Sequence, residues 1–185
     1  MDNLMKNYNL NDLFSDVPKV KYGCAKKLRS LAVENPKELY PSFDFFVELL
    51  DSDNKIIKWT ALDIIGFLSF VDSAKKIDSI LDEIIGFLSA GNLITANHAT
   101  ESLINICIAK PHFSEKIIDN LIKIDRYTFD TDECRNIAIG KVILGLDLLL
   151  DKIKNNPDVL DFVQRGTYNS RNATKKKAEK LLKKI

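Results

Sequence analysis

The sequence predicts an all-α protein built as a stacked array of helical hairpins. Apolar residues recur at the spacing of one helix face along nearly the whole chain, and the alternation typical of strands is almost absent. A small residue followed four and seven positions later by apolar residues recurs five times, interrupted only at Gly145; these anchors are Cys24, Ala61, Ala99, Ala138 and Ala178. They lie 37, 38, 39 and 40 residues apart, and such a period is typical of two-helix repeats.

Proline, glycine and short polar stretches divide the chain into successive helices. Asp16 is expected to cap the first helix, with Pro18 in its first turn, and Pro41 is expected to kink or split the second. The expected helices cover about residues 18–33, 36–50, 55–70, 76–90, 93–109, 113–124, 133–153, 157–164 and 172–184. They form about four hairpins plus a C-terminal helix that caps the last one, with a longer loop at 125–132.

The array is expected to form one domain over residues 16–185. It follows an N-terminal cap segment, residues 1–15, in which Leu10, Leu13 and Phe14 cover the open end.

One hairpin contains a short internal sequence repeat. The sequence DIIGFLS at 63–69 returns as EIIGFLS at 83–89. Helices of this length are unstable alone in water, so both copies are expected to bury the same apolar stripe against neighbours. Gly66 and Gly86 are expected to allow close helix packing.

The first helices of the expected hairpins open in a similar way. Three of them read VKYGCA from Val20, IKWTAL from Ile57 and CRNIAI from Cys134. This pattern resembles the HEAT repeat, a neighbour of the armadillo repeat, over residues 16–185. The resemblance implies a right-handed α-solenoid that serves as a protein-binding scaffold, with the second helix of each hairpin on the concave face. It also implies that the basic residues Lys21, Lys58, Arg135 and Lys175 meet acidic groups such as Asp16, Asp53 and Asp132.

Charge is distributed unevenly along the chain. The formal net charge of +1 divides into +7 on residues 165–185 and −6 on residues 1–164. The expected second helices together carry −8, with acidic positions at Asp44, Glu48, Asp78, Asp82, Asp119 and Asp161. An acidic concave face favours a basic protein segment and repels phosphates. The main hypothesis is therefore a non-enzymatic scaffold that binds a basic protein partner through these residues.

Two basic patches support a different class of function. Helix 18–33 carries five Lys and Arg without an acidic residue, and the last helix is rich in lysine. The alternative hypothesis is a helical-repeat protein that binds DNA, in the manner of some glycosylases, or RNA. Its contacts would be Lys21, Lys26, Lys27, Arg29, Trp59, Lys175, Lys176 and Lys177. Trp59 and Tyr22 occupy equivalent positions, and either form a ligand-facing ridge or pack against the adjacent hairpin.

Catalytic and metal-binding motifs are missing from the sequence. The two histidines, His98 and His112, have no neighbours at ligand spacing, and no phosphate loop, nucleophile elbow or zinc-protease motif occurs. We expect no enzymatic activity, cofactor or metal.

Three cysteines at unpaired spacing, Cys24, Cys107 and Cys134, indicate buried thiols in a reducing compartment, so we expect a cytoplasmic location. Residues 1–6 lack the apolar core of a signal peptide, and no apolar run approaches the roughly 18 residues of a membrane span. We expect a monomer.

Overall fold

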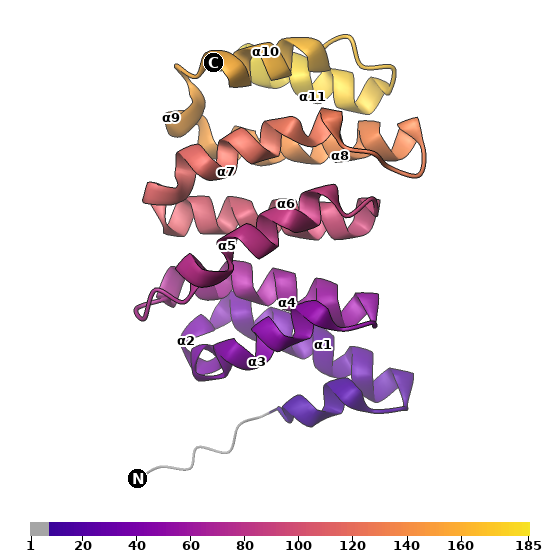
Figure 1. Cartoon of the computed structure of the whole chain (residues 1–185), viewed down its shortest axis with the longest axis vertical. Coiled ribbons are helices and arrows are strands. Elements are labelled where there is room, and N and C mark those ends of the chain that lie inside the picture. Colours follow the sequence, from indigo (N-terminus) through magenta and orange to yellow (C-terminus); the bar gives the residue numbers. More distant parts are fainter. Residues whose placement is uncertain (1–7) are drawn as a thin grey trace.

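The computed structural model describes residues 8–185, which form helices and connecting turns without a strand in that range. Long α-helices alternate with segments in which short α-helices and 3-10 turns follow one another. Figure 1 shows them stacked in chain order from one end of the molecule to the other. The all-α prediction is confirmed for the described part of the chain.

Five long helices form one side of the stack. They are α1 (Pro18–Glu34), α4 (Lys55–Leu68), α6 (Leu93–Ala109), α8 (Asp132–Leu146) and α11 (Asn172–Leu182). We call these five helices the inner row.

Shorter α-helices form the other side, which we call the outer row. They are α2 (Pro36–Leu39), α3 (Phe43–Glu48), α5 (Ile77–Gly86), α7 (Ser114–Leu121) and α10 (Pro157–Gly166). Between or before these helices lie α9 (Leu150–Ile153) and the 3-10 turns η1 (Leu10–Phe14), η2 (Tyr40–Ser42), η3 (Leu49–Asp51), η4 (Ser69–Val71), η5 (Phe87–Ser89), η6 (Pro111–Phe113), η7 (Ile122–Arg126) and η8 (Asp147–Leu149).

Polar side chains begin four of the helices by accepting hydrogen bonds from free backbone N–H groups. Asn54 caps α4, Asn92 caps α6, Thr131 caps α8 and Asn156 caps α10, as these residue types favour. The expected cap at Asp16 is wrong, because Val17 occupies that position without a side-chain hydrogen bond.

The two prolines of the first helices behave as predicted. Pro18 lies in the first turn of α1. Pro41 lies in the 3-10 turn η2, which separates α2 from α3, so the predicted split of the second helix is confirmed.

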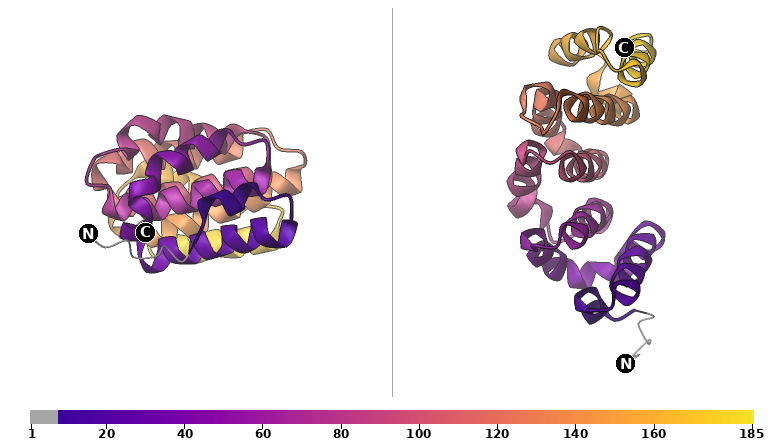
Figure 2. Two further views of the ribbon diagram at one scale, coloured as in Figure 1. Left: turned by 90° about the horizontal axis from the view of Figure 1, so that it is seen from below. Right: turned by 90° about the vertical axis from the view of Figure 1, so that its right-hand side faces the viewer.

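Inner-row helices pack on the outer segments that precede and follow them in sequence. α4 packs on α3, α6 on α5, α11 on α10 and α1 on η1. The pairs lie at common levels in the right-hand view of Figure 2. The expected pairing of a long helix with the segment after it also occurs, because α1 packs on α2 and α6 on α7, and α11 packs on α10 and α8 as the expected cap of the last hairpin. Turn residues mark where a helix ends but carry no information on which neighbour it packs against.

The two rows lie on opposite sides of an arc. In the right-hand view of Figure 2 the inner row follows the concave side and the outer row the convex side. Consecutive inner helices contact one another, most closely α4 with α6, whereas α3, α5, α7 and α10 have no comparable contacts among themselves. This difference follows from the curvature, because the inner side of an arc is the shorter one. The expectation that the second helices of the predicted hairpins line the concave face is wrong.

The core lies between the rows. The anchors face the outer row and are buried: Cys24 is 6% exposed, Ala138 1%, and Ala61, Ala99 and Ala178 0%. At Gly66 a Cβ atom would come within 2.8 Å of the Ser102 Cα atom, so this glycine allows α4 and α6 to approach. Nothing lies within 4 Å of the corresponding position at Gly86, so the packing role predicted for Gly86 is wrong.

The N-terminal cap segment is described from residue 8 onward, and residues 1–7 lie outside the described residues. Leu13 of η1 is buried against α1, at 1% exposure. Phe14 is 58% exposed and meets the Phe45 ring edge-on at 6.0 Å. No helix within residues 8–185 combines the length and the apolar character needed to cross a bilayer.

Candidate interaction surface

Large apolar side chains face solvent at equivalent positions along the concave side. Val33, Phe70 and Ile108 each lie nine residues after an anchor. Nine residues make two and a half turns of an α-helix, so Val33 of α1 and Ile108 of α6 point away from the outer row. Phe70 lies in the 3-10 turn η4 that follows α4. Val33, Phe70 and Ile108 are 57%, 50% and 41% exposed, and Leu148, ten residues after the next anchor, is 69% exposed. We call Val33, Phe70, Ile108 and Leu148 the apolar row.

A pocket adjoins the apolar row between α6 and α8. Its volume is about 170 Å³, similar to the roughly 150 Å³ of an apolar cavity that accepts benzene. Its lining combines apolar side chains with a few polar ones: Phe67, Thr100, Glu101, Ile104, Asn105, Lys141, Leu144, Gly145 and Leu148. A Cβ at Gly145 would lie 2.7 Å from Ile104 Cγ1, so the interruption of the anchor pattern lets Ile104 fit against α8.

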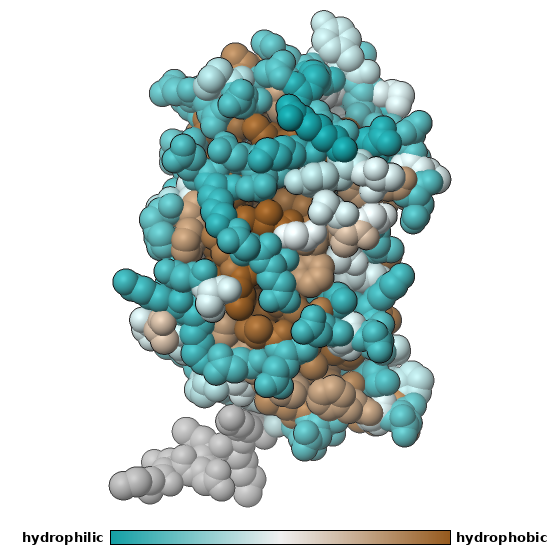
Figure 3. Space-filling view, viewed as in Figure 1, coloured by the Kyte–Doolittle hydropathy of each residue, from teal (hydrophilic) through white to brown (hydrophobic). Residues whose placement is uncertain are grey.

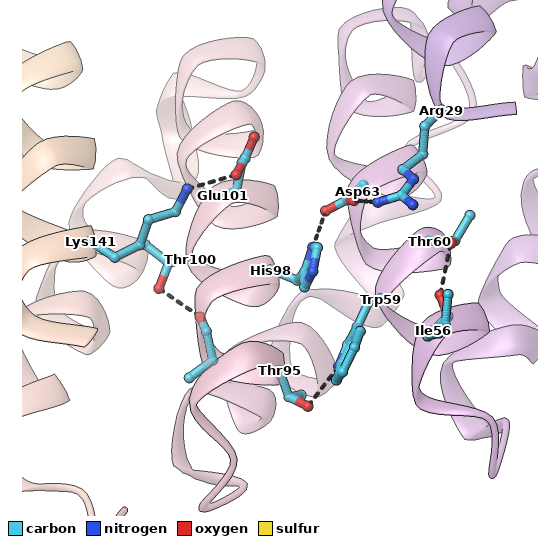
Figure 4. Close-up of polar contacts among 11 residues, drawn as sticks. Arg29, Ile56, Trp59, Thr60, Asp63, Thr95, His98, Thr100, Glu101 and Lys141 are labelled. Atoms are coloured by element: carbon cyan, nitrogen blue, oxygen red, sulfur yellow. Dashed lines mark hydrogen bonds and ion pairs between the residues drawn. The ribbon is translucent and has the colours of Figure 1, made fainter. Parts of the chain in front are cut away.

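Charged side chains link neighbouring inner helices across the middle of the concave side (Figure 4). The Asp63 carboxylate of α4 lies 3.1 Å from Arg29 Nη1 of α1 and 2.6 Å from His98 Nδ1 of α6. Glu101 of α6 lies 2.7 Å from Lys141 Nζ of α8. Both acidic groups in the middle of the inner row are therefore matched by cations of the same chain.

Trp59 is held by the next helix. Its Nε1–H donates to Thr95 Oγ1 at 2.9 Å, and its ring stacks on His98 with centroids 5.6 Å apart and planes inclined by 11° (Figure 4). Of the two interpretations of Trp59, packing against the adjacent hairpin is confirmed. Tyr22, its equivalent on α1, remains 39% exposed.

Unmatched cations concentrate at both ends of the inner row. Lys26 and Lys180 each lie two residues after an anchor, which also turns them away from the outer row. Both are exposed, and neither has an ion-pair partner within residues 8–185, nor do Lys21, Lys27 and Lys176. Lys175 is 4.0 Å from Glu179. Arg29 is paired with Asp63. The predicted basic residues therefore lie in two separate groups, one on α1 and one on α11.

Lys177 lies within a cluster of positive charge. Its Nζ donates to the Gly140 carbonyl at 3.2 Å. Burial lowers the pKa of Lys177, and the positive charges of Arg171 and Lys141 lower it further. An added carboxylate here would relieve this repulsion.

Two of the four basic residues that the HEAT resemblance singles out, Arg135 and Lys175, meet an acidic group, in each case within their own helix. Arg135 lies 3.1 Å from Asp132 at the start of its own helix. Lys58 instead lies over the Phe87 ring, with Nζ 5.6 Å from the centroid.

The two rows carry opposite charge. The five inner-row helices contain thirteen Lys and Arg against six Asp and Glu, a formal charge of +7. The five outer-row helices contain three Lys and Arg against ten Asp and Glu, a formal charge of −7. The predicted acidic surface therefore exists on the convex side, and the concave side is basic.

The six predicted acidic site residues do not converge on one groove. Asp44 lies 2.6 Å from Lys76, Asp82 lies 2.6 Å from Lys116, and Asp161 contacts Arg165. Asp119 and Asp161 line one pocket beside α7 and α10, of about 290 Å³, together with Lys123, Arg126 and Arg165. Glu48 and Asp78 are exposed on the outer row. Figure 3 shows this convex side, with hydrophobic side chains visible among a hydrophilic majority.

Metal-binding side chains do not gather in the described part of the chain. Residues 8–185 contain no cluster of three His, Cys, Asp or Glu side chains placed to hold a metal ion. Burial raises the pKa of the Cys24 and Cys107 thiols, which opposes the thiolate form that nucleophilic chemistry needs. No family model matches the chain, and no curated protein matches it either.

Proposed function

We propose that this protein is a non-enzymatic scaffold, an α-solenoid of the HEAT type with a right-handed superhelix, that binds another protein through its inner row. The apolar row carries the proposal. Large apolar side chains that face solvent in successive repeats offer a row of contact points to a partner. Such a side chain occurs in four successive repeats, next to a pocket of about 170 Å³ that is lined in part by apolar side chains.

The HEAT assignment is supported by the period of the anchors and by the stacking of helix pairs. Three free cysteines support a reducing, cytoplasmic environment. A single copy of the chain buries its anchors, which supports a monomer.

A basic partner bound to the acidic outer row is a weaker proposal. Asp44, Asp82 and Asp161 are each matched by a cation of the chain itself, so a basic partner would have to displace these contacts. The outer row also lies on the convex side, where a partner contacts fewer helices at once.

Nucleic-acid binding is the second candidate, and the charge of +7 on the inner row favours it. Binding of single strands relies on aromatic side chains that are free to stack on bases. Trp59 is already stacked on His98, and three of the four apolar-row residues are aliphatic. The concave surface therefore suits a protein segment better than a nucleic acid.

Selection from a phage-displayed library of random 16-residue peptides tests the proposed function. Enriched peptides are labelled, and fluorescence anisotropy measures their dissociation constants for the wild type and for the double variant Phe70→Ser/Leu148→Ser. We expect at least a tenfold weaker Kd in the variant, because burying two such side chains stabilises a complex by about 1.5–3 kcal/mol each. Leu160→Ser on α10, where Leu160 is 39% exposed, is the matched control and should leave Kd unchanged. Failure to enrich any peptide, or equal binding by the double variant, would contradict the proposal.

A further inference from the structure

We infer that the segment bound by the inner row is acidic and inserts apolar side chains along the apolar row. This inference rests on the proposed function and adds the chemistry of the partner. It reverses the basic partner that the sequence favoured, because the acidic helices lie on the opposite side of the molecule from the apolar row.

Charge complementarity carries the inference. The middle of the concave side is already neutral, since Asp63 is matched by Arg29 and Glu101 by Lys141. Lys26 and Lys180 occupy the position equivalent to Asp63 and Glu101 in the first and last helices of the row, and neither is paired within the described chain. A ligand along the row therefore meets excess positive charge at both ends, and carboxylates are its complement.

The C-terminal end of the row adds to this charge. Lys176 is exposed beside Lys180, and Lys177 lies close enough to Arg171 and Lys141 for their charges to affect it. No acidic side chain in the described chain pairs with Lys176 or Lys177. A partner carboxylate is the missing counter-charge at this end.

The dimensions suit a short peptide segment. Four steps between the five inner helices span about 40 Å, at the usual 8–10 Å between packed helices. An extended chain of about 12 residues covers that distance. Neighbouring residues of the apolar row are one such step apart, so a ligand in the polyproline II conformation, with three residues per turn, would present about every third side chain to the row.

The test uses peptides from the same random library and a charge-reversed double variant, Lys26→Glu/Lys180→Glu. Both side chains are exposed, so the variant should fold as the wild type does, which far-UV circular dichroism and the thermal midpoint check. Lys123→Glu/Lys154→Glu is the matched control, because both of these lysines are exposed and lie outside the inner row. A labelled 20-nucleotide single-stranded RNA is titrated in parallel.

We expect the enriched peptides to be rich in Asp and Glu and to carry large apolar residues. Their Kd should rise at least tenfold in Lys26→Glu/Lys180→Glu and stay within twofold in the control. Enrichment of basic or neutral peptides that still need Phe70 and Leu148 would overturn the acidic partner while leaving the proposed function intact. RNA binding that is tighter than peptide binding, and lost in the charge-reversed variant, would overturn both.

Discussion

Two nearly identical heptapeptides occupy the two rows of this molecule. DIIGFLS at 63–69 ends α4 in the inner row, and EIIGFLS at 83–89 ends α5 in the outer row. Gly66 is buried against Ser102, whereas Gly86 is exposed with no atom in reach. Ser69 is buried and Ser89 is exposed. The same local sequence therefore supports close packing in one row and a solvated surface in the other.

The difference shows that position in the arc, more than local sequence, decides what a helix does here. Inner helices touch one another, so their small residues and charged side chains are used for contacts between repeats. Outer helices stand farther apart, and their acidic side chains reach the next repeat through long lysines. Variants at matched positions in the two rows can break or sharpen this comparison.

The largest effect is expected at Asp72, which ties the separated outer segments together. Its Oδ1 accepts a hydrogen bond from the Tyr40 hydroxyl at 2.6 Å and from the Lys76 N–H at 2.9 Å, while Oδ2 lies 3.3 Å from Lys110 Nζ. Tyr40, Asp72 and Lys110 come from three successive repeats. Asp72→Asn should lower the free energy of unfolding by about 3 kcal/mol, because it leaves Lys110 without its counter-charge.

The pH dependence gives this prediction a specific signature. Burial would raise the pKa of Asp72, but hydrogen bonds from Tyr40, Lys76 and Ile77 and the charge of Lys110 outweigh it and lower the pKa. Because its pKa is lower in the folded state, ionised Asp72 stabilises the fold fully at pH values above the pKa of the unfolded chain, about 3.9. This contribution is lost as the pH falls through the pKa of the folded state. Urea unfolding should show the gap between wild type and Asp72→Asn shrinking below about pH 4. A difference in unfolding free energy that stays constant with pH would argue against a role for the Asp72 charge. Asp78 on α5 is exposed, so the control variant Asp78→Asn should unfold with the same free energy as the wild type.

An intermediate effect is expected at the paired glycines. Gly66→Ala should destabilise the protein by about 1–3 kcal/mol, because the new methyl group lies 2.8 Å from a backbone atom of α6. Gly86→Ala should stabilise it by about 0.5 kcal/mol, because the site is open and helical and alanine costs less chain entropy than glycine. Thermal midpoints measure both. Equal shifts in the two variants would remove the packing difference between the rows.

The small anchor residues and the proline and glycine residues at helix ends predicted the helices well, because helix formation and termination depend on neighbouring residues in the sequence. A buried small residue every 37–40 positions, the split at Pro41 and the turn at Gly91 are all local in sequence. The side of the arc on which each row lies depends on contacts between helices about 20 or 40 residues apart, and turn residues do not encode it. The acidic helices were therefore predicted on the concave side, whereas they lie on the convex side. The apolar row was nonetheless visible in principle, since Val33, Phe70 and Ile108 share one offset from their anchors.

The smallest effect is expected at the first residue of each heptapeptide. Asp63 is 13% exposed and holds Arg29 and His98 together, so Asp63→Asn should cost about 1–2 kcal/mol through its lost charge-assisted contacts. Glu83 is exposed as a whole, but partial burial of its carboxyl and the negative charge of nearby Asp51 raise its pKa, against the opposing charge of Lys58. A raised pKa means that the fold disfavours the charged form, so Glu83→Gln should be neutral or stabilising by up to about 0.5 kcal/mol. Urea denaturation at about pH 7 measures the free energy of unfolding of both variants. An equal loss of stability in Glu83→Gln and Asp63→Asn would show that this acidic position has the same role in both rows.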